Sequence, residues 1–283
     1  MCRLLGYAAA SPTCLRTLIG DSELDRFAAL SRLHGDGWGT SWLEDGEEGP
    51  GRPEVCDRLR TSRSTRAAAA DPHFAEIAGR GVARARTVHL RWATQHYAID
   101  LANTHPFSAD GMSLAHNGAI APRTALDAML TPSMTAQLQG DTDSERYFAL
   151  IRQGLVDDGD PDRVAVAAAR AASALRVQYP DASLNALLLT TDRLVIVHAN
   201  SPRSAPLEEL RAQPGGAPLD HVEAYFLMRW VRTADGSLIF ASSGLTAQDW
   251  TALPEESVTS VDLGTLEMRH LLIAEHDPSG LVA

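Results

Sequence analysis

The chain opens with Met1-Cys2-Arg3-Leu4-Leu5-Gly6-Tyr7, which places a cysteine directly behind the initiator methionine, at the start of a strand-forming run. Two interpretations of Cys2 are open at this point. A cysteine is often only a small apolar residue that is buried in the core. Alternatively, removal of Met1 would expose a residue that carries a thiol and a free amine on the same carbon. The partners that choose between them must come from the rest of the sequence.

An N-terminal cysteine can supply both the nucleophile and the base of a hydrolase. Its thiol has an ordinary pKa of about 8.5, and an α-amino group titrates at about 7.7–8.0. The amine can therefore accept the thiol proton, as it does in N-terminal threonine enzymes. Such a site needs no catalytic histidine, but it needs an oxyanion hole and groups that hold the substrate.

Asn117-Gly118 is a candidate for the oxyanion hole. The pair follows a predicted strand at residues 111–116, where an amide side chain and a glycine N–H can converge on one oxygen. The same dipeptide is also a common turn. Taken alone, it favours the turn.

Arg91 and Asp143 are candidates for holding an α-amino acid. Arg91 ends a β-prone run and can clamp a carboxylate with two parallel hydrogen bonds. A structural ion pair beside a buried Trp92 is the alternative. Residues 141–145 form a helix-capping pattern, which by itself explains their acidic side chains. If Asp143 faces a cleft, however, it can accept the ammonium group of the same ligand.

Seven short blocks then occur in a fixed order, and together they resemble the class II glutamine amidotransferases. Arg91 and Asn117, and Asn117 and Asp143, are each 26 residues apart, which fits that family's even spacing. The resemblance is clear over residues 1–150. The blocks are Cys2, Gly6, Gly-Asp-Gly-Trp-Gly at 35–39, Arg-Trp-Ala-Thr at 91–94, Asn-Thr-His-Pro at 103–106, His-Asn-Gly at 116–118 and Thr-Asp-Ser-Glu at 142–145.

The resemblance implies an α+β fold, a four-layer αββα sandwich of the N-terminal-nucleophile hydrolase type, which we expect to form one domain over residues 1–283. It also implies a role for each matching residue. Cys2 would be the nucleophile, with Asn117 and Gly118 as the oxyanion hole. Arg91 would hold the substrate α-carboxylate and Asp143 its α-ammonium. Trp92, Thr94 and His105 would bind or position the substrate. The sequence departs from the family at Gln95-His96, which follow Thr94 where many members have His-Gly.

Cys2-Arg3 and the Asp-Gly-Trp-Gly stretch at 36–39 are most similar to a stand-alone branch, the γ-glutamyl amidohydrolase of ergothioneine biosynthesis. This similarity implies cleavage of a γ-glutamyl amide through a thioester on Cys2, with release of glutamate. The substrate would be glutamine or a γ-glutamyl conjugate. We expect no fused synthase domain in 283 residues. A glutaminase that passes ammonia to a separate synthase, a non-catalytic glutamine-sensing module, and a cysteine peptidase with His105 or His116 as base remain alternatives.

Composition excludes several other classes of function. The formal net charge is −11, whereas a nucleic-acid surface needs clustered lysine and arginine. Three cysteines are too few for a secreted disulfide framework, and we expect Cys14 and Cys56 to be bystanders. No apolar run approaches the roughly 18 residues that span a bilayer. The histidines lack zinc-site spacing. We therefore expect a cytoplasmic protein without metal or cofactor, and a homo-oligomer remains open.

The elements follow from periodicity and turn signals. Residues 60–66 are expected to form a solvent-exposed connection, and residues 203–219 a linker. Residues 93–110 are expected to form a long loop, and whether this loop closes over a bound substrate as a lid is left open. The apolar stripe of the second long helix, Val164, Ala168, Ala171 and Leu175, is expected to pack in the core. Helices are expected at 22–30, 72–81, from about 142 and from 160, and strands at 1–10, through 42, 87–92, 111–116, 184–190, 193–199, 222–232, 237–241, 257–262 and 265–273.

Overall fold

A computed structural model describes residues 2–44, 59–94, 97–156, 159–201, 207–211, 224–246 and 249–277. Cys56, Gln95-His96 and most of the expected linker lie outside the described residues. The strands are β1 (Arg3–Thr13), β2 (Trp38–Leu43), β3 (Leu59–Ser64), β4 (Ala83–Leu90), β5 (Phe107–Ala109), β6 (Met112–Asn117), β7 (Asn185–Leu189), β8 (Arg193–His198), β9 (Arg229–Arg232), β10 (Leu238–Ala241), β11 (Thr251–Ala252), β12 (Ser257–Asp262) and β13 (Met268–Leu272). The helices are α1 (Leu15–Ala29), α2 (Arg123–Asp127), α3 (Pro132–Thr135), α4 (Asp143–Gln153), α5 (Arg163–Gln178) and α6 (Leu207–Arg211), with the short helices η1 (Leu30–Arg32), η3 (Ala68–Ala70), η4 (Phe74–Arg80) and η6 (Ile273–Glu275).

Two antiparallel sheets form the centre of the molecule. One has the strand order β11-β9-β10-β1-β4-β2-β3, and the other has the order β13-β12-β8-β7-β6-β5. The first strand of the chain is central in its sheet, because Leu5 of β1 pairs with Val88 of β4 on one side and with Ala241 of β10 on the other. The start of the chain is thereby fixed in the interior of a sheet.

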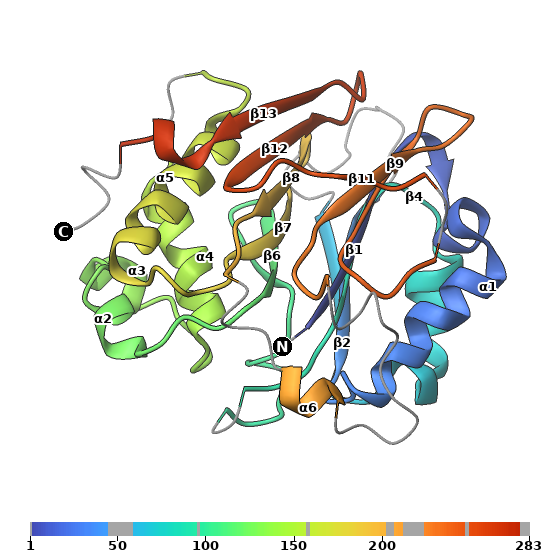
Figure 1. The fold of residues 1–283 in the computed structure, drawn as a ribbon, viewed down its shortest axis with the longest axis horizontal. Coiled ribbons are helices and arrows are strands. Elements are labelled where there is room, and N and C mark those ends of the chain that lie inside the picture. Colours follow the sequence, from blue (N-terminus) through green and yellow to red (C-terminus); the bar gives the residue numbers. More distant parts are fainter. Residues whose placement is uncertain are drawn as a thin grey trace, which may run out of the picture.

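The sheets stack face to face and carry helices on their outer faces (Figure 1). Leu4, Leu187 and Phe240 belong to the apolar layer between the sheets. Helices α4 and α5 share a second apolar cluster with the sheet that contains β6 and β7. Helix α1 and η4 pack on the other sheet in a third cluster. The expected α+β fold with four layers, αββα, is therefore confirmed.

The composition of β1 and α5 explains why these elements are buried. Seven successive residues of β1 from Arg3 are buried, as expected for a central strand covered on both faces. At Gly6 a Cβ would lie 3.1 Å from Leu187 Cδ1 of the facing sheet, so the glycine permits close stacking of the sheets. The alanine-rich stripe of α5, Val164 to Leu175, is buried as expected.

Three sequence expectations differ from the structure. The first long helix begins at Leu15 rather than at residue 22, and it contains a kink at Gly20, whose φ is +80°. Residues 59–64 form the edge strand β3 instead of a solvent-exposed connection. Strand β9 is only four residues long, and residues 224–226 before it form a turn. Gly20 interrupts the helical pattern of α1, and the polar composition of β3 removes the alternating pattern of a strand. Neither element is therefore recognisable in full from the sequence.

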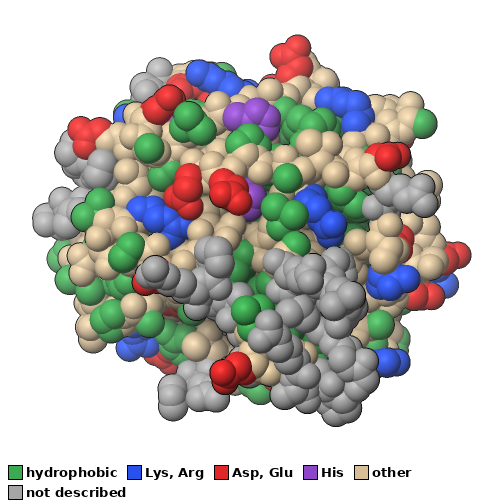
Figure 2. Space-filling model, viewed as in Figure 1, with side chains coloured by type: hydrophobic (Ala, Val, Ile, Leu, Met, Phe, Trp, Pro, Cys, Tyr) green, Lys and Arg blue, Asp and Glu red, His purple; other side chains and the backbone are tan. Residues whose placement is uncertain are grey.

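Charges of both signs are interspersed over the described part of the face shown in Figure 2. This face therefore has no continuous basic area among its described residues. Within the described ranges, every helix is too short or too polar to be a candidate for crossing a membrane.

Candidate active site

Cys2 lies where the two sheets meet, at the ends of β1 and β6. Its main-chain nitrogen donates to Asn117 Oδ1 at 2.8 Å, and its thiol donates to the Trp92 carbonyl at 3.7 Å. The residue is 6% exposed. The fold therefore places the nitrogen and sulfur of Cys2 against two of the predicted site residues.

The Asn117 amide is oriented by its bond to Cys2. Because Oδ1 accepts from the Cys2 nitrogen, Nδ2 points elsewhere, and it is buried without a hydrogen-bond partner in the described structure. A buried amide N–H without a partner costs free energy unless a ligand accepts it. At Gly118 a Cβ would overlap the Ser183 carbonyl oxygen, so only glycine fits beside Asn117.

Arg91 is held by the glycine-rich segment before β2. Its main-chain N–H donates to the Gly37 carbonyl at 2.8 Å, and the Asp36 carboxylate accepts from the Ala93 N–H at 2.8 Å. The guanidinium donates to the Ala98 carbonyl at 3.0 Å. Burial lowers the pKa of Arg91, and Cys2 and Asp36 oppose that shift. A guanidinium has five N–H groups, so donors remain for a carboxylate.

Asp143 is the first residue of α4, and Thr142 caps that helix by accepting from Glu145 N–H at 3.2 Å. The Asp143 carboxylate accepts from the Ile120 N–H at 2.6 Å and is 5% exposed. Helix dipoles and free N–H groups stabilise an anion at this end. The expected capping pattern is present, although Glu145 bonds Gln139 and Gly140 rather than its own cap.

Three buried histidines lie beneath Cys2. The rings of His89 and His105 are 4.2 Å apart, and His116 bonds Ser144 Oγ at 2.9 Å and the Ser183 carbonyl at 2.9 Å. Burial lowers the pKa of His89 to about 3, and burial also lowers the pKa values of His105 and His116. All three rings are therefore neutral near pH 7.

The predicted residues converge on one small pocket. Its walls include seven of them, and the eighth, Asn117, bonds Cys2 directly. The free volume is about 20 Å³, which is about the space of one water molecule. A glutamyl group therefore requires the walls to move apart. The seven are Cys2, Arg91, Trp92, Thr94, His105, Gly118 and Asp143.

Several residues of this pocket have no role predicted from the sequence. Tyr97, Asn103 and Ser144 also line it. Asn103 and Ser144 lie inside the blocks that carry the resemblance, so their position in those blocks is a signal for them. Tyr97 lies in a loop whose path the sequence does not reveal.

The turn at residues 224–226 packs on Arg3, the neighbour of Cys2 in the chain. Arg3 is fully buried, donates to the Tyr225 carbonyl at 3.0 Å, and lies 3.7 Å from the centre of the Tyr225 ring. Asn185, which pairs with Asn117 in the sheet, donates to the Phe226 carbonyl at 2.5 Å. Burial raises the pKa of Tyr225 to about 12. No local sequence pattern signals a contact over more than two hundred residues.

The three buried histidines near Cys2 show no arrangement for a metal ion in the described structure. His89 Nε2 bonds the His116 carbonyl, His116 Nδ1 bonds Ser144 Oγ, and the His105 ring packs on the His89 ring. Within the described ranges, no group of three or more His, Cys, Asp or Glu side chains is arranged to hold a metal ion.

A model of the family described as glutamine amidotransferases class-II matches residues 1–275. The chain belongs to this family. Its N-terminal blocks and the arrangement of the sheets agree with the expectation from the sequence, so that recognition is confirmed.

The individual relatives share between 18% and 37% sequence identity with this chain. Over 122 residues the chain is 37% identical to a glutamine–fructose-6-phosphate aminotransferase (isomerizing) of Pseudomonas syringae pv. tomato, a match that spans 43% of this chain but only 19% of that protein. A glutamine aminotransferase class-II domain protein from Silicibacter pomeroyi superposes with a TM-score of 0.60 at 19% identity, covering 96% of this chain and 99% of its own. A predicted glutamine amidotransferase from Pseudomonas aeruginosa gives 0.51 at 18% identity, over 94% and 98% of the two chains. These two structures show the fold.

Proposed function

We propose that this protein is an N-terminal-cysteine amidohydrolase that cleaves a γ-glutamyl amide and releases glutamate. The observation that carries the proposal is the pairing of Cys2 with Asn117, whose Oδ1 accepts from the Cys2 nitrogen and whose Nδ2 is buried without a partner in the described structure. The same pocket holds a guanidinium at Arg91 and a carboxylate at Asp143. These are the groups that bind the two charges of an α-amino acid.

The chemistry proceeds in two halves once Met1 is removed. The Cys2 amine takes the thiol proton, and the sulfur attacks the γ-carbonyl carbon of the substrate. Asn117 Nδ2 and the Gly118 N–H stabilise the oxyanion, and one such donor is worth about 10²–10³ in rate. The C–N bond breaks, and the leaving amine takes the proton from the Cys2 ammonium. Water then attacks the thioester, and glutamate leaves.

The histidines favour this mechanism over a cysteine–histidine peptidase. His116 bonds Ser144 Oγ and the Ser183 carbonyl through its two ring nitrogens, so neither nitrogen faces the thiol as a base. Burial lowers the pKa of His105 well below its usual value, which makes its ring a weak proton acceptor. The α-amine of a processed Cys2 has a pKa suited to neutral pH.

Glutamine and γ-glutamyl conjugates are the two candidate substrates of this proposal. The first would make the protein a glutaminase that supplies ammonia to a separate synthase. The second corresponds to the stand-alone branch similar to the ergothioneine-pathway amidohydrolase. A cytoplasmic location and a small-molecule substrate belong to the same proposal.

A glutamate-release assay tests the proposal. Wild-type protein should release glutamate from glutamine or from at least one γ-glutamyl amide conjugate, and Cys2→Ala should abolish this while keeping the circular dichroism spectrum. Cys14→Ala is the matched control and should retain full activity, because Cys14 directly precedes α1 and does not line the pocket. Full activity of Cys2→Ala would refute the mechanism. A folded, fully processed wild-type protein that binds glutamine without releasing glutamate would favour the sensing module.

A further inference from the structure

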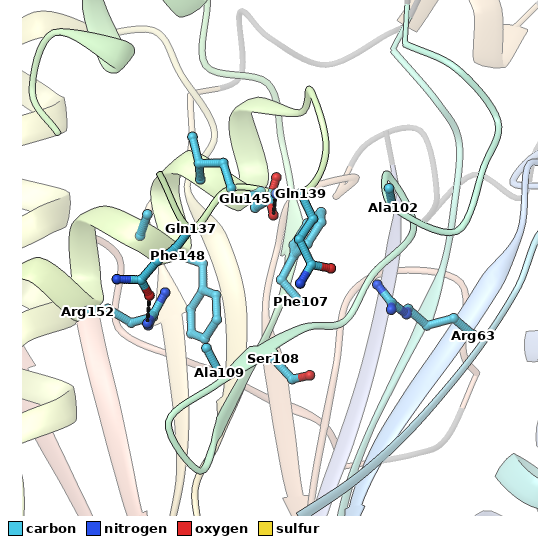
Figure 3. Close-up of a pocket in the computed structure, with 12 residues that line it drawn as sticks. Arg63, Ala102, Phe107, Ser108, Ala109, Gln137, Gln139, Glu145, Phe148 and Arg152 are labelled. Carbon is cyan, nitrogen blue, oxygen red and sulfur yellow. Dashed lines mark hydrogen bonds between the residues drawn. The ribbon is translucent and has the colours of Figure 1, made fainter. Parts of the chain in front are cut away.

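A second cavity, of about 450 Å³, is lined in part by the 102–107 segment, which also contributes residues to the Cys2 pocket. Figure 3 shows the residues that line this second cavity. Asn103 and His105 line the Cys2 pocket, whereas Ala102 and Phe107 line the cavity. The first turn of α4 is divided in the same way, since Asp143 faces Cys2 and Glu145 faces the cavity. The two volumes thus share a wall and have different lining residues.

The cavity lies where the two sheets end at the same edge. Strand β3 is the last strand of one sheet and β5 is the last strand of the other. Arg63 comes from β3, Phe107 comes from β5, and Phe148 comes from α4 (Figure 3). Pockets that bind small molecules have volumes of about 300–1,000 Å³, so the size of this cavity is suitable for one.

Arg63 gives the cavity a positively charged end. Its side chain extends from β3 into the cavity (Figure 3), and within the described structure its guanidinium donates to the Thr104 carbonyl at 3.3 Å. Burial lowers the pKa of Arg63, and Glu145 opposes that shift. Because a guanidinium has five donors, most of those of Arg63 are open to a ligand. A planar carboxylate fits that fork.

Glu145 gives the cavity a negatively charged end. Its two oxygens accept from the Gln139 and Gly140 N–H groups, each at 2.8 Å, which fixes the carboxylate in place. The second arginine of the cavity, Arg152, is paired with Asp110 and adds little free charge. A multiply charged anion such as phosphate would be repelled by Glu145, whereas a ligand with one carboxylate and one ammonium group matches both ends.

Polar side chains form most of the remaining lining. Ser108, Gln137 and Gln139 line the cavity, whereas Phe107 and Phe148 are 4% and 3% exposed and therefore offer a ligand little aromatic surface. A short polar side chain on the ligand suits this lining better than an apolar one.

We propose that this cavity is a second binding site, for a small zwitterionic carboxylate of amino-acid size with a short polar side chain. The carboxylate binds Arg63, the ammonium group faces Glu145, and the side chain lies among Ser108, Gln137 and Gln139. This site is separate from the proposed hydrolysis at Cys2 and does not depend on it.

Calorimetric titration of the full-length protein with L-serine tests the site. Saturable binding is expected, and it should weaken at least tenfold in Arg63→Gln. Arg60→Gln is the matched control on the same strand, because Arg60 pairs with Glu44 at 2.8 Å and does not line the cavity. Ser108→Trp, at an exposed cavity position, should also abolish binding by filling the space. Circular dichroism verifies that each variant is folded.

Two further sets of titrations distinguish this site from the Cys2 pocket and from a site for a single charge. Binding should persist in Arg91→Ala, since Arg91 belongs to the Cys2 pocket. Ethanolamine, 3-hydroxypropionate and inorganic phosphate each lack one of the two charges and should bind at least tenfold more weakly. The proposal is overturned by loss of binding in Arg91→Ala, by full binding in Arg63→Gln, by tighter binding of phosphate, or by no saturable binding of L-serine. Glutamate release, measured separately, bears only on the proposed function.

Discussion

At the scale of single residues, Gly118 is a position with little tolerance for change. Alanine there would place its Cβ on the Ser183 carbonyl oxygen, so the segment after Asn117 must move. We expect Gly118→Ala to lower the free energy of unfolding by about 1–3 kcal/mol, as overpacking does, and to reduce activity at least tenfold. Urea denaturation and glutamate release measure the two effects. Gly264→Ala, where a Cβ would meet only Asp262 Oδ1 at 3.2 Å, should leave activity unchanged. Equal effects of the two substitutions would contradict this expectation.

The buried histidines make stability depend on pH. The folded-state pKa of His89 is lowered by burial to about 3, while the unfolded value is about 6.5. Between these values the unfolded chain binds the additional proton, so stability is present above pH 6.5 and is lost as the pH falls. One unit is worth about 1.4 kcal/mol, so His89 accounts for roughly 2 kcal/mol of the loss between pH 7 and pH 5.

His89→Gln should therefore lose about 2 kcal/mol less than wild type over that pH range, as measured by urea denaturation at both pH values. His73→Gln is the control, because the His73 side chain is 72% exposed. Its pH dependence should match that of wild type. If His89→Gln also matches wild type, the buried neutral histidine does not contribute in this way.

The residues that meet around Cys2 could be predicted because each lies in a short block with a recognisable chemical purpose. Arg91, Asn117 and Asp143 are found in this way, and the structure brings them into one site. Tyr225 could not be predicted, because its contact with Arg3 depends on how the last third of the chain folds back. The need for glycine at position 39 could not be predicted either. A Cβ there would overlap the His105 carbonyl oxygen, and this contact is seen only in the folded chain.

At the scale of elements, the start of α4 connects stability to substrate binding. Thr142 caps the helix and is followed directly by Asp143. Thr142→Ala should cost about 1 kcal/mol of stability, and it should raise KM several-fold with a smaller effect on kcat because Asp143 moves. Steady-state kinetics with the best γ-glutamyl substrate measures both constants.

Thr131 provides the matched control for that experiment. It caps α3 by accepting from Met134 N–H at 3.3 Å, and it does not line the Cys2 pocket. Thr131→Ala should cost a similar amount of stability without changing KM. A KM that rises equally in both variants would mean that loss of stability, and not displacement of Asp143, is responsible.

Elements with strong periodicity could be predicted, and elements shaped by tertiary contacts could not. The alanine-rich α5 and the apolar strands β7 and β8 follow from pattern alone. Strand β3 carries no strand pattern in its sequence because it is polar, as edge strands often are to avoid further pairing. The sequence predicts only the second part of helix α1, because Gly20 interrupts its regular backbone. The turn at 224–226 likewise depends on contacts with distant residues.

At the scale of the whole molecule, we propose that residues 1–283 fold as one domain. Strand β1 at the start of the chain pairs with β4 and with β10, which begins at Leu238. The first sheet therefore cannot form without both ends of the sequence. Calorimetry should show a single cooperative transition, at the same midpoint as tryptophan fluorescence and far-ultraviolet circular dichroism. Two separated transitions would contradict one domain.

The proposed reaction depends on the free amine and the thiol that Cys2 presents once Met1 is removed. In the structure its main-chain nitrogen donates to Asn117 Oδ1 and its thiol to the Trp92 carbonyl. Mass spectrometry of the N-terminal peptide from acid-quenched turnover tests the proposed reaction most directly. We predict a peptide that begins at Cys2 and carries one glutamyl group, and this adduct should be missing without substrate. A fully active preparation whose N-terminal peptide still begins at Met1 and carries no adduct would contradict the mechanism.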